Sequence, residues 1–132
     1  MSESDRLARV LVVDDDEGIV VMLCETLQQA GLGTFGATSA TDALEFLRDA
    51  SDELDAVVVD EGLPGSSGTE LLRVVHEEHP HVLRVLMTGW VTEAVEGAER
   101  DGTIERVIEK PWLHRAVPEL IVWIGAARRP RS

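Results

Sequence analysis

Five short apolar runs alternate along the chain with segments of helical periodicity, and this alternation constrains the fold more than any other feature. The runs are rich in valine, isoleucine and leucine, as is typical of strands that are buried on both faces. They cover residues 8–13, 34–37, 56–59, 82–87 and 104–108. Strands joined through helices run parallel within one sheet. The sequence therefore predicts an α/β domain, a doubly wound, five-stranded parallel sheet with helices on both faces.

The helices expected between these runs show apolar residues at every third or fourth position, and most have a boundary signal. Asp16 and Ser39 are residue types that cap the first turn of a helix, and each precedes such a segment. Pro80 stops the third helix. The last helix contains Leu120, and we expect it to begin or to kink at Pro118, which suits a first helical turn.

Composition places the chain among globular domains and excludes several classes of function. The 132 residues are 44% hydrophobic and carry a net charge of −13, which argues against a surface that binds nucleic acid. No apolar run is long enough to span a bilayer, and the polar start does not resemble a signal peptide. Cys24 is the only cysteine, so no internal disulfide can form and a cytoplasmic location is expected. We expect a tail over 1–8, one domain over 9–125, and a tail or the start of a linker over 126–132.

Polar residues follow the predicted strands at the point where each strand ends. Asp14 and Asp15 follow the first strand, Asp60 ends the third, Thr88 ends the fourth and Lys110 follows the fifth. The carboxyl ends of parallel strands form one edge, where open α/β sheets bind ligands. Three carboxylates placed together repel unless a hard cation lies among them, and Mg²⁺ prefers such oxygen ligands. A lysine and a hydroxyl add what a phosphoryl group requires, so we interpret Asp60 as a nucleophile.

Four motifs carry a resemblance to a known family. They are VLVVDDDE at 10–17, VVVDEGLPGSSG at 57–68, LMTG at 86–89 and EKPW at 109–112. In order and spacing the chain resembles, over about residues 9–124, the receiver domain of bacterial two-component response regulators. The resemblance implies the flavodoxin-like (βα)5 fold with a phosphorylation site at the carboxyl edge of its sheet.

The resemblance also implies roles for individual residues at that edge. Asp60 would be the phosphoacceptor, which takes a phosphoryl group from a sensor histidine kinase, a phosphotransfer protein or a small phosphodonor. Asp14 and Asp15 would hold Mg²⁺ together with a carboxylate oxygen of Asp60 and the backbone carbonyl of Gly62. Such a domain is not an enzyme beyond its own phosphorylation and dephosphorylation.

The remaining implied roles concern the response to phosphorylation. Lys110 would pair with the phosphoryl group, and Thr88 would hydrogen-bond to it and draw its loop inward. The face made by the fourth helix, the fifth strand and the fifth helix would then move and control a partner protein or an output domain; the same face could form a homodimer. Neither nucleic acid nor a membrane is a direct partner. Val107 stands where many relatives have an aromatic residue, which puts the usual coupling in doubt.

Two positions that influence dephosphorylation in the family are Gly62 and Trp90. Neither side chain can orient a water molecule as a carboxylate or an amide does. If Trp90 folds over the pocket, it excludes water, and on this basis we expect slow self-dephosphorylation compared with relatives that have asparagine or glutamate at these positions. If Trp90 points to solvent, Gly62 leaves the pocket open to water.

Two other functions remain as alternatives at this stage. A degenerate receiver would act only as a phosphorylation-independent binding module; the intact acidic site argues against it, while Val107 and Gly62 keep it open. A phosphohydrolase of the haloacid dehalogenase type would use Asp14 and Asp16 as its D-x-D motif. However, Gly18 stands where that family has threonine or valine.

Two further patterns have simpler interpretations. Gly31, Gly33 and Gly36 spell the dinucleotide-binding pattern G-x-G-x-x-G, but they follow a helix and enter a strand, the reverse of the required context. Gly31 is therefore interpreted as a helix terminator. The histidines in HEEHPH, residues 76–81, could gather a transition metal, although solvated cations near a helix end are the simpler interpretation.

Overall fold

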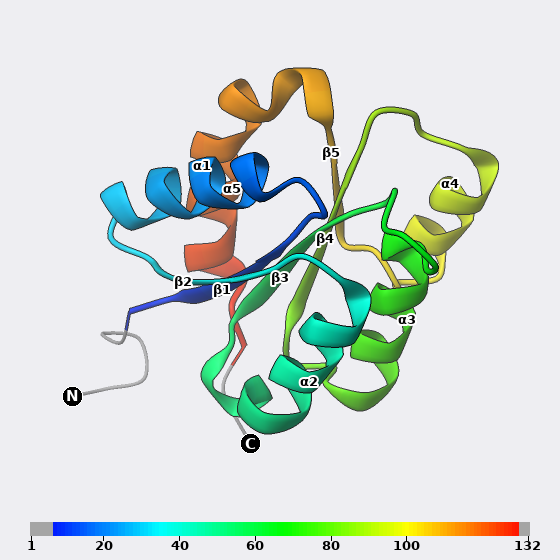
Figure 1. Cartoon of the computed structure of the whole chain (residues 1–132), viewed down its shortest axis with the longest axis horizontal. Helices are drawn as coiled ribbons and strands as arrows, with labels where there is room; N and C mark the ends of the chain where they lie inside the picture. The colour runs from blue at the N-terminus through cyan, green and yellow to red at the C-terminus, as the bar shows by residue number, and fades with distance from the viewer. Residues whose placement is uncertain (1–6, 130–132) are drawn as a thin grey trace.

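The computed structural model describes residues 7–129, and its centre is a parallel sheet with the strand order β2-β1-β3-β4-β5 (Figure 1). The strands are β1 (Arg9–Val13), β2 (Gly33–Ala37), β3 (Ala56–Asp60), β4 (Leu83–Thr88) and β5 (Arg106–Glu109). Every neighbouring pair is parallel. The predicted doubly wound fold is therefore confirmed, and β1 lies next to β3 as the approach of their carboxylates requires.

Five helices cover the two faces of this sheet. They are α1 (Glu17–Gln29), α2 (Ala40–Ala50), α3 (Gly68–Glu78), α4 (Glu93–Arg100) and α5 (Leu113–Ala127). Buried residues of α1 and α5 share one apolar cluster with the sheet, and those of α2, α3 and α4 share the other. No helix among the described residues is long and apolar enough to cross a membrane.

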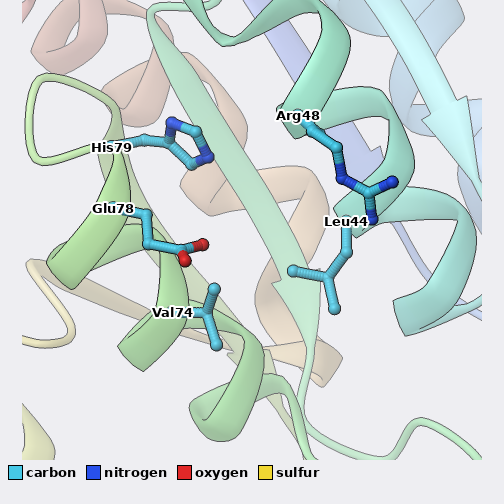
Figure 2. A pocket seen from close by; sticks show the side chains of 5 residues that line it. All are labelled: Leu44, Arg48, Val74, Glu78 and His79. Atoms are coloured by element: carbon cyan, nitrogen blue, oxygen red, sulfur yellow. The ribbon is translucent and has the colours of Figure 1, made fainter.

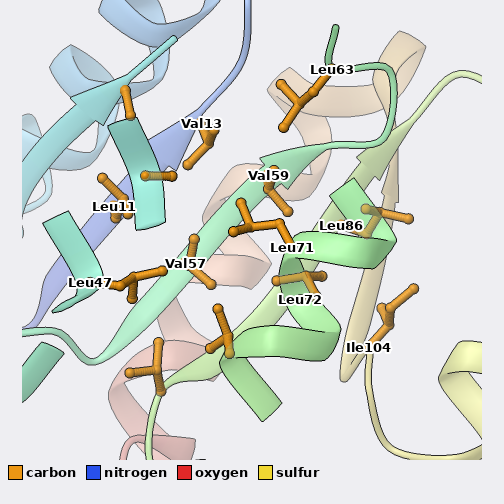
Figure 3. Close-up of a cluster of buried hydrophobic side chains, with 14 of the residues drawn as sticks. Leu11, Val13, Leu47, Val57, Val59, Leu63, Leu71, Leu72, Leu86 and Ile104 are labelled. Carbon is orange, nitrogen blue, oxygen red and sulfur yellow. The ribbon is translucent and has the colours of Figure 1, made fainter. Parts of the chain in front are cut away.

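The two apolar clusters divide the strands residue by residue. Leu11, Val13, Val57 and Val59 point to the side of α2 and α3 (Figure 3), and their neighbours Val10, Val12, Ala56 and Val58 point to the other side. All of these side chains are buried. Because side chains alternate along a strand, a run that is apolar at every position must lie between two covered faces.

The last helix differs from its predicted start. α5 begins at Leu113, five residues before Pro118, and includes that proline in its interior. Leu113, Val117, Leu120 and Ile124 are all buried and lie three or four residues apart, so they form one apolar face. Burial of this face extends the helix in front of the proline, although Pro118 lacks the N–H for one helical hydrogen bond and its ring crowds the carbonyl of His114.

The ends of the chain refine the predicted domain limits. α5 continues to Ala127, past the expected end at Gly125, and Arg129 still contacts the body of the molecule. The remainder of the two predicted tails, residues 1–6 and 130–132, lies outside the described part of the chain.

Other local predictions are confirmed. Asp16 caps α1 by accepting hydrogen bonds from the backbone of Gly18 and Ile19, and Ser39 caps α2 in the same way. Gly31 ends α1 with a positive φ of 92°, a conformation that favours glycine. A Cβ on Gly36 would lie 2.6 Å from Val20, so this glycine permits close packing of α1 on β2.

A buried arginine organises the amino ends of β4 and β5. Arg84 is only 4% exposed, and its guanidinium donates hydrogen bonds to four backbone carbonyls, those of Pro80, Val82, Gly102 and Thr103. These carbonyls belong to the segments that lead into the two strands. The arginine therefore ties together two loops that are distant in sequence.

Glu105 completes this cluster at the amino edge of the sheet. Its Oε1 lies 3.3 Å from Nη2 of Arg84, and its two oxygens accept hydrogen bonds from the guanidinium of Arg129 at 3.2 and 2.5 Å. Burial by itself raises the pKa of Glu105, but the hydrogen bonds from Arg129 and the charges of both arginines hold it below its usual value. We refer to Arg84, Glu105 and Arg129 as the arginine cluster; it fastens the chain after α5 to the sheet.

Candidate functional site

Three carboxylates meet at the opposite, carboxyl edge of the sheet. Asp14 and Asp15 follow β1 and Asp60 ends β3; one oxygen of each lies within 4.8 Å of the others. β1 and β3 are hydrogen-bonded neighbours, so the loop after β1 starts beside Asp60. This acidic triad is the juxtaposition that the order of polar residues at the strand ends predicts.

Within the acidic triad Asp14 is fully buried and Asp60 is 6% exposed, whereas Asp15 is exposed. Oδ1 of Asp14 accepts a hydrogen bond from the backbone N–H of Asp16 at 2.9 Å, which fixes the first loop. Its Oδ2 accepts no hydrogen bond from any described residue. Burial raises the pKa of Asp14, and the charge of Asp60 adds to the effect, so the ionised form is disfavoured in the site as it stands.

Lys110 supplies the nearest positive charge. Its Nζ lies 3.1 Å from Oδ2 of Asp14 and 3.1 Å from Oδ1 of Asp60, at the end of β5. Burial lowers the pKa of Lys110, but the two carboxylates raise it by more, so the ammonium form is favoured. One lysine facing three carboxylates leaves a net negative charge in a largely buried place.

Thr88 ends β4 at the same edge but has its hydroxyl bound to its own loop. The Oγ1 of Thr88 donates to the backbone carbonyl of Trp90 at 2.9 Å and accepts from the N–H of Trp90 at 3.2 Å. The indole of Trp90 is 78% exposed. The expectation that Trp90 folds over the pocket is therefore wrong, and the alternative, that it points to solvent, is the one observed.

The loop after Asp60 is held close to the acidic triad by small residues. A Cβ on Gly62 would lie 3.4 Å from Oδ2 of Asp60, so this residue borders the carboxylate. Gly68 begins α3, and a Cβ there would overlap the backbone carbonyl of Asp60. The observed geometry requires glycine at position 68, whereas a Cβ at position 62 would make an ordinary contact with the carboxylate of Asp60.

Glu61 closes this loop and was not anticipated from the sequence. Its Oε1 accepts hydrogen bonds from the backbone N–H and the hydroxyl of Thr69, at 2.7 and 2.8 Å, in the first turn of α3. The sequence shows that Glu61 follows Asp60. Its partner Thr69, however, lies eight residues further along the chain, across an irregular loop. No local pattern predicts that pairing.

The acidic triad fits a small divalent cation. Oδ2 of Asp14 is buried with no hydrogen bond besides its 3.1 Å ion pair with Lys110, and that one lysine also faces Asp60, so the site carries surplus negative charge. Hard divalent cations bind carboxylate oxygens, and two further exposed groups, Asp15 and Gly62, border the position. The donor set is therefore suited to an oxygen-coordinated metal ion.

The histidines of residues 76–81 do not form a second metal site. The only group of three or more potential ligands found in the described residues is the acidic triad. The ring of His81 contacts the carbonyl oxygen of Ser51 at 2.8 Å. His79 lines a groove between α2 and α3, opposite Arg48 (Figure 2), and burial lowers its pKa. The interpretation as solvated cations does not hold for His79, because burial favours its neutral form.

Most of the chain matches a known protein family. Residues 10–121 match the model of the response regulator receiver domain. The response regulator protein FleR of Pseudomonas aeruginosa is 34% identical over 127 residues, which are 95% of this chain and 26% of FleR. The chain thus spans about a quarter of that relative's length.

Solved structures show the same fold. The signal receiver domain of an HD domain-containing protein from Pseudomonas fluorescens Pf-5 is 30% identical, with a TM-score of 0.80 over 92% of this chain and 88% of the other. The CheY-like response regulator receiver domain protein from Methanospirillum hungatei JF-1 is 26% identical, with a TM-score of 0.82 over 92% of this chain and 95% of the other.

Proposed function

Because the chain belongs to the family of response regulator receiver domains, we propose that Asp60 is the residue on which it accepts a phosphoryl group. A receiver domain is a phosphoacceptor signalling module, which excludes the haloacid dehalogenase alternative. The observation that carries the proposal is the position of Asp60, nearly buried at the end of β3, beside Asp14 and Asp15 and 3.1 Å from Lys110.

The proposed reaction is an in-line displacement at phosphorus. A carboxylate oxygen of Asp60 forms a bond to the phosphorus of a phosphohistidine, and the phosphorus–nitrogen bond breaks. The electron pair of that bond remains on the imidazole nitrogen, which takes up a proton. With acetyl phosphate as the donor, the leaving group is acetate.

We propose that Mg²⁺ is held by the carboxylates of Asp14, Asp15 and Asp60 and by the backbone carbonyl of Gly62. When bound, the ion supplies positive charge that offsets the carboxylates and the phosphoryl oxygens. The burial of Asp14 supports this assignment, since its Oδ2 has only the shared ammonium of Lys110 to offset its charge.

Lys110 and Thr88 are proposed to hold the transferred group. Lys110 would exchange its contact with Asp60 for one with a phosphoryl oxygen, because it already lies at this carboxylate. Thr88 would donate its hydroxyl to another oxygen, which requires it to release the backbone carbonyl of Trp90. The loop after β4 would then rearrange, and the face made by α4, β5 and α5 would move.

The partners and the wider context follow from the family. Receiver domains interact with histidine kinases; we propose a sensor kinase or a phosphotransfer protein as the donor and a partner protein or an output domain as the target. We further propose a cytoplasmic location, a receiver domain over 9–125 and self-association through α4, β5 and α5. We propose nothing for this chain from the activities of the longer relatives.

Incubation with acetyl phosphate and Mg²⁺, followed by intact-mass spectrometry, tests the proposal. We expect one phosphoryl group on the wild type and none on Asp60→Asn. Glu77→Gln, which neutralises an exposed acid on α3, is the matched control and should be labelled like the wild type.

Three outcomes would contradict the proposal. Labelling of Asp60→Asn at the wild-type level would place the acceptor elsewhere. Absence of labelling in the folded wild type, with acetyl phosphate and with a histidine kinase, would favour a degenerate receiver that only binds proteins. Undiminished labelling when Mg²⁺ is removed with a chelator would refute the metal assignment.

A further inference from the structure

The outer edge of β2 is an open strand edge in the described part of the chain. β2 lies at one end of the sheet and pairs only with β1 (Figure 1). The N–H of Gly33 donates to Ala8 and the carbonyl of Ala37 accepts from Asp14, so these residues face inward. Because the direction of the backbone groups alternates along a strand, Thr34 and Gly36 direct their N–H and C=O groups outward. Neither proline nor a charged residue, the usual protections of an edge, occurs in β2.

A row of acids borders this edge. Asp42, Glu45 and Asp49 lie on the exposed side of α2, and with Phe46 and residues 36–38 they line a groove of about 460 Å³ beside the end of β2. None of the three acids forms an ion pair with a basic residue among those that the structure describes. The groove therefore combines unpaired backbone groups, an aromatic wall and three uncompensated negative charges.

We propose that this groove binds an extended, basic segment of another protein, which adds to β2 as a sixth strand. Backbone hydrogen bonds to Thr34 and Gly36 would hold the segment, and lysine or arginine side chains would face the acids of α2. From Asp42 to Asp49 the helix rises roughly 10 Å, and alternate residues of a strand lie about 6.7 Å apart. Two basic residues at positions i and i+2 thus lie within the length of the acidic row.

The negative charge of the groove favours a basic segment over a second copy of the chain and over nucleic acid. A second copy of the chain paired through β2 would bring two acidic rows toward each other, and each chain already carries a net charge of −13. Nucleic acid would be repelled in the same way. Arg129, in the basic stretch after α5, is already bound to Glu105, so it does not supply the charge.

A seven-residue peptide of alternating lysine and valine is a suitable probe, with affinity measured by calorimetry or fluorescence anisotropy. We expect the triple variant Asp42→Asn, Glu45→Gln, Asp49→Asn to bind it at least tenfold more weakly than the wild type. The matched control Glu77→Gln, Glu96→Gln, Glu99→Gln changes net charge equally, on α3 and α4, and should bind within about twofold of the wild type. Equal weakening in both variants would overturn the proposal, because binding would then follow net charge alone.

Strand addition has its own tests. Thr34→Pro removes an N–H that the β1–β2 ladder does not use, so the fold is retained and binding should fall at least tenfold. In the wild type the peptide should slow amide hydrogen exchange at Thr34 and Gly36, a measurement that needs no variant. Unchanged exchange at both amides would overturn the proposal, as would dimerisation through β2 in sedimentation experiments without the peptide.

Discussion

The molecule contains two buried charge clusters at opposite edges of one sheet, and they are built on opposite principles. In the arginine cluster at the amino edge, Arg84 donates to four carbonyls and contacts Glu105, whose oxygens also accept from Arg129. In the acidic triad at the carboxyl edge, three carboxylates lie together, and one lysine is the ion-pair partner of both Asp14 and Asp60.

This difference separates a structural cluster from a functional one. Buried charges stabilise a fold only when partners satisfy them, as at the arginine cluster. The acidic triad leaves negative charge only partly compensated, which is unfavourable by itself and favours the binding of a cation. The pKa values carry the same contrast: that of Glu105 is lowered and that of Asp14 is raised.

The largest effect is expected from Arg84→Met. Removal of the guanidinium leaves buried carbonyls without a donor and Glu105 with Arg129 alone, and we expect a loss of roughly 3–5 kcal/mol in the free energy of unfolding, measured with urea. Arg48→Met, on the exposed side of α2, should change it by less than about 0.5 kcal/mol. Similar small changes in both variants would show that the arginine cluster is not structural.

Glu105→Gln should have the next largest effect, about 2 kcal/mol of destabilisation at pH 7, from the loss of charge-assisted hydrogen bonds. The pKa of Glu105 is lowered on folding. The stabilisation of the fold by ionised Glu105 is therefore present above the pKa in the unfolded chain, and it is lost as the pH falls through the pKa in the folded protein. The deficit of the variant should therefore shrink below about pH 4. Urea titrations of both proteins at several pH values measure it; a deficit that grows toward low pH would contradict the lowered pKa.

Addition of Mg²⁺ should stabilise the wild type by about 1.4 kcal/mol at a concentration ten times the dissociation constant. The variant Asp14→Ala, Asp15→Ala should lose this gain, whereas Glu105→Gln should keep it in full. Thermal unfolding with and without the ion measures the difference. Equal stabilisation of the double variant would place the metal away from the acidic triad.

Asp14→Asn should stabilise the metal-free protein by about 1 kcal/mol at pH 7, because it removes a charge whose burial is uncompensated. The pKa of Asp14 is raised on folding. Its ionisation therefore destabilises the folded protein progressively, as the pH rises from the pKa in the unfolded chain through the pKa in the folded protein. The extra stability of Asp14→Asn should therefore vanish below about pH 4. Its sign is opposite to that of Glu105→Gln, which destabilises the protein. The same urea titrations, with a chelator present, test it; a destabilised variant at pH 7 would show that Lys110 fully compensates Asp14.

The smallest effect is expected from Trp90→Ala, which should leave the decay rate of the phosphorylated protein within about twofold of the wild type. The indole is exposed and does not cover the acidic triad, so its removal does not change the access of water. Decay of the labelled protein, followed by intact mass, gives the rate. Strong acceleration in the variant would restore the shielding interpretation.

The alternation of apolar runs and helical segments predicted the sheet and its covering helices, because burial on two faces leaves few other solutions. The acidic triad was predictable for a related reason: strand order brings Asp14 and Asp60 together once each is placed at a strand end. The start of α5 was not predictable from the sequence. Pro118 is a local signal for a helix start, but the packing of the buried face of α5 against the sheet extends the helix in front of it.

The arginine cluster was equally beyond prediction. Arg84 stands out as a lone charge in an apolar run, but its partners Glu105 and Arg129 lie 21 and 45 residues away along the chain. The hydrogen bonds of the Thr88 hydroxyl depend on the path of one irregular loop. Such contacts are set by the packed structure, and no periodicity encodes them.

Gly68 has a consequence for inheritance rather than for chemistry. A methyl group there would overlap the carbonyl of Asp60 and press on Leu86, so a single codon change to alanine displaces the strand end that presents the proposed acceptor. In a genetic screen such an allele would resemble loss of Asp60 itself, although position 68 takes no part in the reaction. Alleles that compensate for it would be expected among residues that let α3 move away, and Leu86 is the first place to look for them.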